Sequence, residues 1–268
     1  MANWADDIAP VVRTVADLDF DGIEVSLLGM TDEKAASLSS IVKEHGLSIT
    51  CTTGLSHDAD IASADAAQSD QGTAYMRWAI GATAALGAHV LTGVVYAPWG
   101  HFEPDAKKER TERAATALGS LDGDLERFDV VLGLEAINRF ETDLVNTAAE
   151  ATALAEQAGS LRIGVLLDTF HMNIEETELR SAIRTAGKHL KHFHCSDNNR
   201  GVPGSGHVAW DDVRAGLADI EYDDWVVMEM FVQAGLPTSA DLNIWRPMAS
   251  DPTRAAADGL AFLRDKLG

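Results

Sequence analysis

The stretch LLDTFHMNIEE, residues Leu166–Glu176, joins the end of an apolar run to a cluster of polar side chains. The run stops on Asp168, and His171 follows three residues later. Strands buried on both faces are near-continuous apolar runs, so an acid at the end marks the point where the chain leaves the core. The segment therefore predicts a buried strand whose carboxyl end faces a polar site. We interpret Glu175 and Glu176 as the acidic start of the next helix.

The same order, a short apolar strand followed by a longer amphipathic segment, recurs along the chain. The predicted strands are Gly22–Leu28, Leu47–Thr53, Val90–Val95, Val130–Glu135, Ile163–Asp168, Leu190–His194 and Trp225–Glu229. The predicted helices are Asp6–Leu18, Asp32–His45, Thr73–Leu86, Lys107–Arg127, Leu144–Ala158, Thr177–Gly187, Trp210–Leu217 and Thr253–Leu267. Repeated strand–helix units predict a parallel sheet of the α/β class with crossover helices.

The number of these segments indicates the architecture. Eight helices are the number that surrounds a (β/α)8 TIM barrel, but only seven strands are recognisable. The chain opens directly on the first helix, so we expect a barrel that lacks the usual first strand. No Ser/Gly-rich linker or shift in composition divides the chain, and residues 1–268 are interpreted as a single domain.

Composition excludes several classes of function. The chain has 42 acidic residues against 21 Lys and Arg, a net charge of -21. Such a field repels phosphate backbones, so no nucleic-acid partner is expected, and the charge is interpreted as an acidic, well-solvated surface. The two distant cysteines, Cys51 and Cys195, indicate a reduced setting. With no signal peptide and no apolar run of about 18 residues, we expect a cytoplasmic protein without a membrane span.

Four consecutive predicted strands end on a residue that can bind a metal ion: Glu135, Asp168, His194 and Glu229. The carboxyl ends of parallel barrel strands lie on one face, so these side chains are expected to converge. A single acid at a strand end is commonly a helix cap or a loop acceptor, but four in succession favour a metal site. Three carboxylates and one imidazole suit Mn²⁺, the first candidate, or Mg²⁺ or Co²⁺.

A site of this composition suits proton transfer beside a sugar carbonyl. A divalent ion on a carbonyl and a neighbouring hydroxyl oxygen acidifies the adjacent C–H and stabilises the enediolate that forms. Glu135 and Glu229 come from strands across the barrel from one another, which makes them candidates for base and acid on opposite faces of that carbon. Glu141, His171 and Arg200 lie just beyond strand ends, where they could hold substrate oxygens.

With these residues identified, the chain resembles the ketose 3-epimerases, which include the D-tagatose, D-allulose (psicose) and L-ribulose 3-epimerases of the xylose isomerase-like barrels. The resemblance extends from about Trp4 to the C-terminal FLRDKLG. The segments that carry it are EAINRFETDLVNTAAEA (Glu135–Ala151), LLDTFHMNIEE (Leu166–Glu176), HFHCSDNNRGVPGSGHVAW (His192–Trp210) and VVMEMFV (Val226–Val232). The DTFHMNIEE string is highly specific for the family, whereas VME alone is weak.

The resemblance implies an isomerase that epimerises a free ketose at C3 with a divalent metal ion. The implied metal ligands are Glu135, Asp168, His194 and Glu229. Glu135 and Glu229 would also exchange the C3 proton. The implied substrate contacts are Glu141, His171 and Arg200 at the C1–C3 end of the ketose, and Trp99 as an aromatic lining the pocket, with simple loop packing as the alternative for Trp99. A homodimer or homotetramer is implied as well.

Two departures from the family pattern lead to further expectations. Where the family has H-x-G-E, this chain has His194-Cys195-Ser196-Asp197, and the shorter acid is expected to retune substrate contacts or metal geometry. Family members also carry a strand before the position of Trp4. A mis-assigned start codon, a truncation tolerated through rearrangement or a neighbouring chain, and a degenerate inactive barrel are three explanations. Folding without that strand predicts reduced stability, because two sheet edges lose their partners.

Other functions fit parts of the pattern. A related aldose–ketose or hydroxypyruvate-type isomerase would use the same site with proton transfer between C1 and C2, although the loop motifs favour the epimerase. DNA-repair endonucleases that share this barrel need several zinc ions and a basic face, which the charge opposes. A catalytically impaired barrel that binds a partner through its open edge is the third alternative, and the intact ligand set argues against it.

Overall fold

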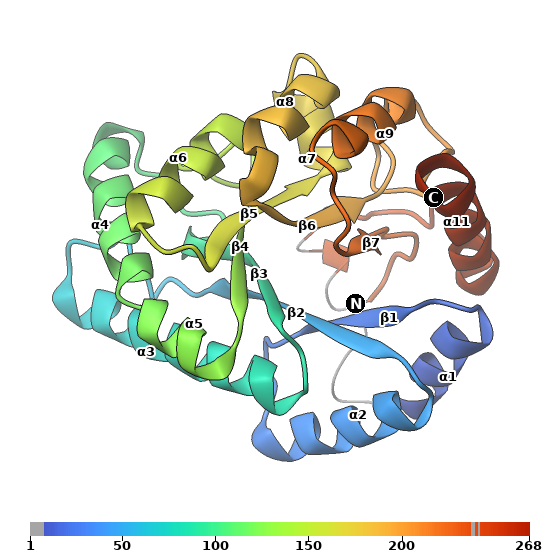
Figure 1. Cartoon of the computed structure of the whole chain (residues 1–268), viewed down its shortest axis with the longest axis horizontal. Coiled ribbons are helices and arrows are strands. Elements are labelled where there is room, and N and C mark those ends of the chain that lie inside the picture. Colours follow the sequence, from blue (N-terminus) through green and yellow to red (C-terminus); the bar gives the residue numbers. More distant parts are fainter. Residues whose placement is uncertain (1–7, 237–238, 241) are drawn as a thin grey trace.

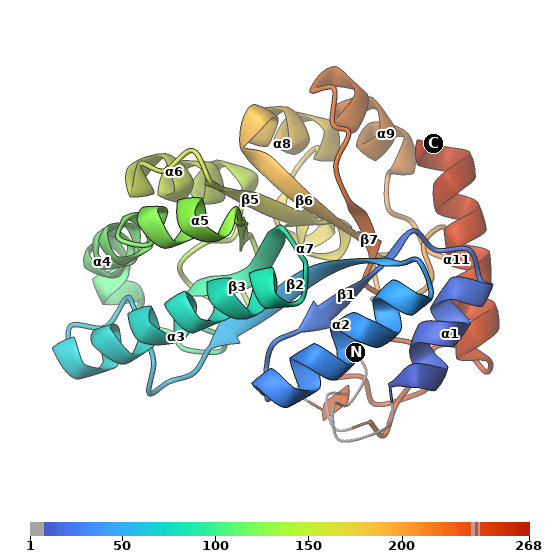
Figure 2. The same cartoon turned by 60° about the horizontal axis from the view of Figure 1, so that its bottom comes forward.

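The computed structural model describes residues 8–236, 239–240 and 242–268. Its centre is one parallel sheet in the order β1-β2-β3-β4-β5-β6-β7. The strands are β1 Gly22–Ser26, β2 Ser48–Leu55, β3 Val90–Pro98, β4 Val131–Glu135, β5 Ile163–Asp168, β6 Leu190–Cys195 and β7 Val226–Met228. The sheet curls into a barrel with the helices outside it (Figures 1 and 2). The predicted TIM barrel with seven recognisable strands is therefore confirmed for the described residues.

Helices follow the strands and cover the outer face of the sheet (Figure 1). They are α1 Ala9–Asp17, α2 Asp32–Glu44, α3 Ala66–Ala85, α4 Lys107–Gly119, α5 Asp122–Phe128, α6 Ala148–Ala158, α7 Thr169–Glu175, α8 Leu179–Ala186, α9 Trp210–Asp219 and α11 Pro252–Leu267, with short 3-10 helices at Pro104–Ala106 and Gly187–His189. Side-chain caps explain several starts: Thr31, Thr147 and Asp251 each accept a hydrogen bond from a backbone N–H in the first turn of the helix that follows.

Besides shifted starts, such as Ala66 rather than Thr73 for α3, the helix predictions contained two errors. The segment predicted as one helix over Lys107–Arg127 is two helices, α4 and α5. Gly119 lies so close to the end of α6 that a Cβ atom there would be 2.5 Å from the carbonyl oxygen of Ala158. The chain turns at this contact and starts a new helix, whose first turn carries Asp122 and Asp124. The second error concerns α7, which was not predicted and begins immediately after β5.

The gap between the first and last strands is called the seam. Within the described ranges, β1 and β7 stand at opposite ends of the sheet and are not paired with each other. A cavity of about 930 Å³ lies there, lined by residues of α1, β1, β7 and α11 among others. Arg264 Nη1 of α11 lies 2.8 Å from Asp19 Oδ2, just before β1, and so links the two sides. The expectation of a missing first strand concerns residues 1–7, which lie outside the described residues.

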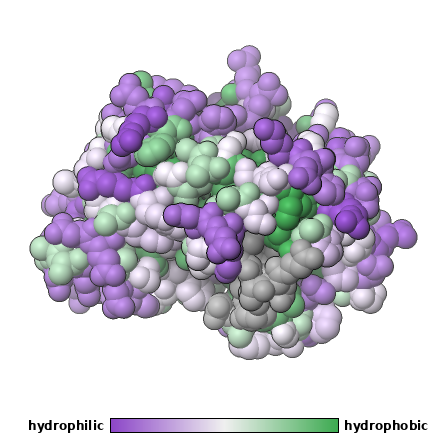
Figure 3. Space-filling model, turned by 90° about the horizontal axis from the view of Figure 1, so that it is seen from below, coloured by the Kyte–Doolittle hydropathy of each residue, from purple (hydrophilic) through white to green (hydrophobic). Residues whose placement is uncertain are grey.

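The surface is largely hydrophilic, as expected for a chain rich in acidic residues. Seen from below, hydrophilic residues cover most of the periphery, and hydrophobic residues gather toward the middle of this face (Figure 3). No helix in the described part of the chain is long and apolar enough to cross a membrane.

Candidate metal and substrate site

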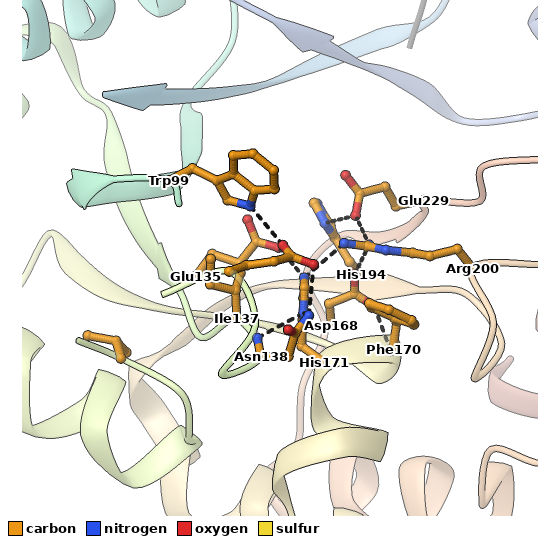
Figure 4. Close-up of polar contacts among 12 residues, drawn as sticks. Trp99, Glu135, Ile137, Asn138, Asp168, Phe170, His171, His194, Arg200 and Glu229 are labelled. Atoms are coloured by element: carbon orange, nitrogen blue, oxygen red, sulfur yellow. Dashed lines mark hydrogen bonds and ion pairs between the residues drawn. The ribbon is translucent and has the colours of Figure 1, made fainter. Parts of the chain in front are cut away.

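The carboxyl ends of β4 to β7 bring four potential metal ligands together (Figure 4). Glu135 and Asp168 are the last residues of β4 and β5, and His194 lies in β6 directly opposite Asp168. Glu229 follows β7, and its N–H donates to the carbonyl of Cys195 at 3.0 Å, which extends the pairing by one residue. One donor atom from each of the four ligand side chains lies within 4.8 Å of the others. The predicted convergence is therefore present in the structure.

The charges in this group fit a divalent cation. Burial and the neighbouring Glu229 raise the pKa of Glu135 to about 8, and burial raises that of Asp168 to about 6 despite the nearby Arg200. Nδ1 of His194 is buried and makes no aligned hydrogen bond within the described residues. Three hard oxygen donors and a buried imidazole nitrogen without an aligned hydrogen bond are what a site for Mn²⁺, Mg²⁺ or Co²⁺ requires.

Glu229 differs from Glu135 in its protonation. Burial alone would raise the pKa of Glu229, but His194 and Arg200 together hold it below its ordinary value. The Nδ1 atom of His194 lies 3.3 Å from Glu229 Oε2, and Arg200 Nη1 lies 2.8 Å from the same oxygen. At neutral pH without a bound metal, Glu135 is therefore mainly protonated and Glu229 ionised. Two carboxyl groups in opposite states can serve as acid and base.

Arg200 extends its guanidinium into the group of potential metal ligands. Its Nη1 donates to Asp168 Oδ2 at 2.7 Å, and its guanidinium stacks on the ring of Phe170 at 4.3 Å. The residue has a left-handed backbone with φ 62°, held by a hydrogen bond from its N–H to the carbonyl of Asp197. A bulky residue rarely takes this conformation, so the turn is specified by its surroundings and fixes where the guanidinium points.

His171 is within reach of the site. The sequence had suggested a loop position for it, but it lies in a helix. It lies in α7, which begins at once because Asp168 Oδ1 accepts from the N–H of Phe170 and caps the helix. Its Nδ1 accepts from the backbone N–H of Asn138 at 3.0 Å, and its Nε2 lies 2.9 Å from Nη2 of Arg200. Nε2 lies 3.7 Å from Glu135 Oε1. Burial and Arg200 keep the pKa of His171 well below its ordinary value, which leaves a neutral ring.

Glu141 and Trp99 meet at the rim of the site. Trp99 Nε1 donates to Glu141 Oε2 at 2.9 Å, and the N–H of Gly100 donates to the Glu141 carbonyl at 2.8 Å. The amide of Asn138 donates to Glu141 Oε1 at 2.8 Å. Asn138 thus joins Glu141 to His171. Sequence reasoning missed Asn138, although it stands inside the quoted EAINRFE segment.

The two acids at the end of the opening stretch do not start a helix, and that interpretation was wrong. Glu175 is the last residue of α7, where its carboxylate accepts from both Nε and Nη2 of Arg139. Glu176 accepts from the N–H of Ala148 at 2.7 Å, at the start of α6. Both carboxylates thus fasten the segment that follows β4 to the segment that follows β5.

Asp197, the shortened acid, organises a loop. Its carboxylate accepts from the backbone N–H groups of Asn198, Gly204 and Val208, at 2.9, 2.9 and 3.2 Å. Burial opposes ionisation, but backbone donors that include the N–H groups of Asn198 and Val208 lower the pKa of Asp197. The shape of the loop that presents Arg200 therefore depends on this side chain.

The comparisons with known proteins agree with this fold and site. Residues 12–266 match the family described as xylose isomerase-like TIM barrel. The D-psicose 3-epimerase of Agrobacterium fabrum (strain C58) is 34% identical over 276 residues, covering 99% of this chain and 96% of that protein. The L-ribulose 3-epimerase of Mesorhizobium japonicum is 33% identical over 94% of this chain and 86% of that protein. A D-psicose 3-epimerase crystallised in the presence of D-fructose superposes with a TM-score of 0.93 at 34% identity, covering 99% of this chain and 95% of that one.

The chain belongs to the xylose isomerase-like TIM-barrel family. Within it, the chain groups with the ketose 3-epimerases, which are isomerases that act on carbohydrates.

Proposed function

We propose that the protein epimerises a free ketose at C3, with Glu135 and Glu229 as the proton-transfer pair in a metal-dependent reaction. The observation that carries the proposal is the position of these two glutamates, one at the end of β4 and one just after β7, within one four-ligand group. Inversion at a carbon beside a carbonyl needs one group to remove the proton and another to return it on the opposite face. Two carboxyl groups that reach the same site from different strands meet that need.

The metal ion would be held by the four strand-end ligands: Glu135, Asp168, His194 and Glu229. When bound, a divalent ion supplies Lewis acidity that lowers the pKa of a C–H beside a ketose carbonyl. We take Mn²⁺ as the first candidate and Mg²⁺ or Co²⁺ as alternatives, because oxygen ligands dominate the group. The affinity of the protein for each of the three ions, once measured, ranks them.

In the forward direction, ionised Glu229 removes the proton from C3. The electron pair of the broken C–H bond moves into the C2–C3 bond, and the C2 carbonyl oxygen takes the charge of the resulting enediolate. Protonated Glu135 then returns a proton to C3 from the opposite face, which gives the epimer. For the reverse direction the two glutamates exchange roles, so the site serves both epimers.

The remaining predicted contacts would hold the sugar in place. The guanidinium of Arg200, which lies beside the neutral ring of His171, is a donor placed for the oxygens that gain charge in the enediolate. Glu141, held by Trp99 and Asn138, is an acceptor for a sugar hydroxyl at the rim. Trp99 is 39% exposed, so part of its ring is free to lie against the sugar.

A panel of ketoses tests the proposal. Fructose, allulose, tagatose, sorbose, ribulose and xylulose are incubated with chelator-treated protein and with protein reloaded with Mn²⁺, Mg²⁺ or Co²⁺, and the products are separated by chromatography. We expect C3 epimers that form only with added metal. Aldoses as products would instead indicate proton transfer between C1 and C2, and no turnover with any metal or sugar would contradict the enzyme assignment.

A further inference from the structure

Glu24 is an acid in the middle of β1 whose side chain reaches the strand that carries the His194 ligand. Its Oε2 lies 2.7 Å from Nε2 of His192 and accepts from Thr50 Oγ1 at 2.9 Å. Its Oε1 lies 2.7 Å from Nε2 of His194. The N–H of His194 is not aligned with Oε1, so this second contact is an ion pair rather than a hydrogen bond.

The two ring nitrogens of His194 face different groups. Nε2 faces Glu24, and Nδ1 faces the metal-ligand group, 3.3 Å from Glu229 Oε2. A histidine binds a metal through the lone pair of one ring nitrogen while its other nitrogen keeps the proton. A carboxylate opposite the second nitrogen fixes that proton and the ring orientation, and it makes the ligand more basic.

The additional contact with His192 is the reason that the side chain at position 24 has to be a carboxylate. The carboxylate of Glu24 offers one acceptor oxygen to each of the two buried histidines. An amide in its place would have a single acceptor oxygen, and its NH₂ group would then face the N–H of one histidine.

We propose that Glu24 is a positioning residue: it holds His194 with Nδ1 toward the ligand group and thereby sets the affinity of the site for its metal. The inference rests on the proposed metal-dependent function. The same three side chains, Glu24, His192 and His194, also form a group able to hold an ion themselves, which gives the test a second outcome to distinguish.

The test measures metal binding rather than turnover. Mn²⁺ is titrated calorimetrically into chelator-treated wild type, Glu24→Gln and the control Glu126→Gln, which makes the same chemical change on an exposed residue of α5. We expect one ion per chain in all three and about 10–100-fold weaker binding in Glu24→Gln alone. The visible absorption bands of Co²⁺-loaded protein should also change in Glu24→Gln, because the orientation of an imidazole ligand alters them.

Three results would overturn the inference or its basis. An unchanged Kd and Co²⁺ spectrum in Glu24→Gln would remove the positioning role while leaving the metal site intact. Two ions in wild type and one in Glu24→Gln would make Glu24 a ligand of a second site. No binding by wild type would contradict the proposed function itself.

A folding defect in Glu24→Gln would be seen by circular dichroism. In that event Glu24→Asp carries the test, since it keeps both acceptor oxygens on a side chain one methylene shorter. Weaker Mn²⁺ binding by folded Glu24→Asp supports the positioning role, and an unchanged Kd overturns it.

Discussion

Arg200 Nη1 donates a 2.7 Å hydrogen bond to Asp168 Oδ2, and both side chains are buried. The guanidinium is thus a permanent cation among the acids that we propose bind the metal ion. Its charge compensates part of the acidic cluster when no metal is bound. The stability of the metal-free protein should therefore depend on Arg200 more than that of the metal-bound protein does.

Arg200→Gln tests this dependence. Removing one partner of a buried ion pair costs about 3–5 kcal/mol, because it leaves a buried charge without compensation. We expect that loss in urea unfolding of chelator-treated protein, and a smaller loss with saturating Mn²⁺. The control is Arg254→Gln, whose exposed pair with Asp258 should contribute under about 1 kcal/mol. An equal loss with and without Mn²⁺ would contradict the compensating role.

The two proposed proton-transfer residues should be individually essential. Glu135→Gln and Glu229→Gln each keep the shape of the side chain and remove its ability to transfer a proton. We expect each to lower kcat for epimerisation by about 10²–10⁴-fold and to leave, at most, the C3 deuterium uptake from D₂O that the remaining carboxylate supports, followed by NMR. Glu126→Gln should retain both activities. Epimerisation at the wild-type rate in either site variant would exclude a two-carboxylate mechanism.

Raised pKa values in the site predict how stability varies with pH. The folded pKa of Glu135 is about 8 against an ordinary value of 4.5, and that of His194 is also raised. Between about pH 6.5 and 8 the metal-free native state binds more protons than the unfolded state, so stability falls as pH rises. The His171 shift is downward and acts below that window.

Glu135 alone contributes roughly 2 kcal/mol to this decline, at about 1.4 kcal/mol per pH unit. The measurement is urea unfolding at several pH values with chelator and again with saturating Mn²⁺. A bound cation lowers the pKa of Glu135, so the decline should become smaller when Mn²⁺ is present. A metal-free stability that rises over the same window would show that Glu135 is ionised.

Trp99 should act on substrate binding more than on chemistry. Trp99→Phe keeps an aromatic ring but removes the hydrogen bond to Glu141. We expect KM to rise about 3–10-fold with a smaller change in kcat, since a hydrogen bond to a charged group contributes about 1.5–3 kcal/mol when buried and less at this half-exposed rim. Trp78→Phe in α3, where the ring packs beside Tyr75, is the control and should leave KM unchanged. A fall in kcat alone would contradict this role.

The sequence predicted the features that depend on burial. Apolar runs long enough for a strand marked the seven strands, and the polar residue at the end of each of four runs marked the ligand group. The α4–α5 break was not predictable, because it arises where Gly119 meets the carbonyl of Ala158 in α6. The position of His171 on a helix depended on the cap supplied by Asp168, which sequence spacing alone did not reveal.

One of the residues that sequence reasoning missed, Glu24, has a partner far away in the chain. Glu24 in the strand GIEVSLL is an acid within an apolar run, which was the available signal. Its histidine partner His192 stands 168 positions later, so only the folded barrel brings them together. Asn138 was overlooked for a different reason. An amide in a loop has no charge to attract attention, although its backbone and side chain organise two predicted substrate contacts.

The seam has a consequence for the order in which the molecule assembles. In the described residues, no backbone ladder joins β1 to β7, and the circle is completed by side chains such as Arg264 with Asp19, which are 245 positions apart. Contacts over such distances along the chain form late in folding, since the loop they close is the longest available. Amide hydrogen exchange should therefore be faster in β1 and β7 than in β3 to β5. Transient opening at the seam would turn the barrel into an unrolled ribbon while its central strands stay paired.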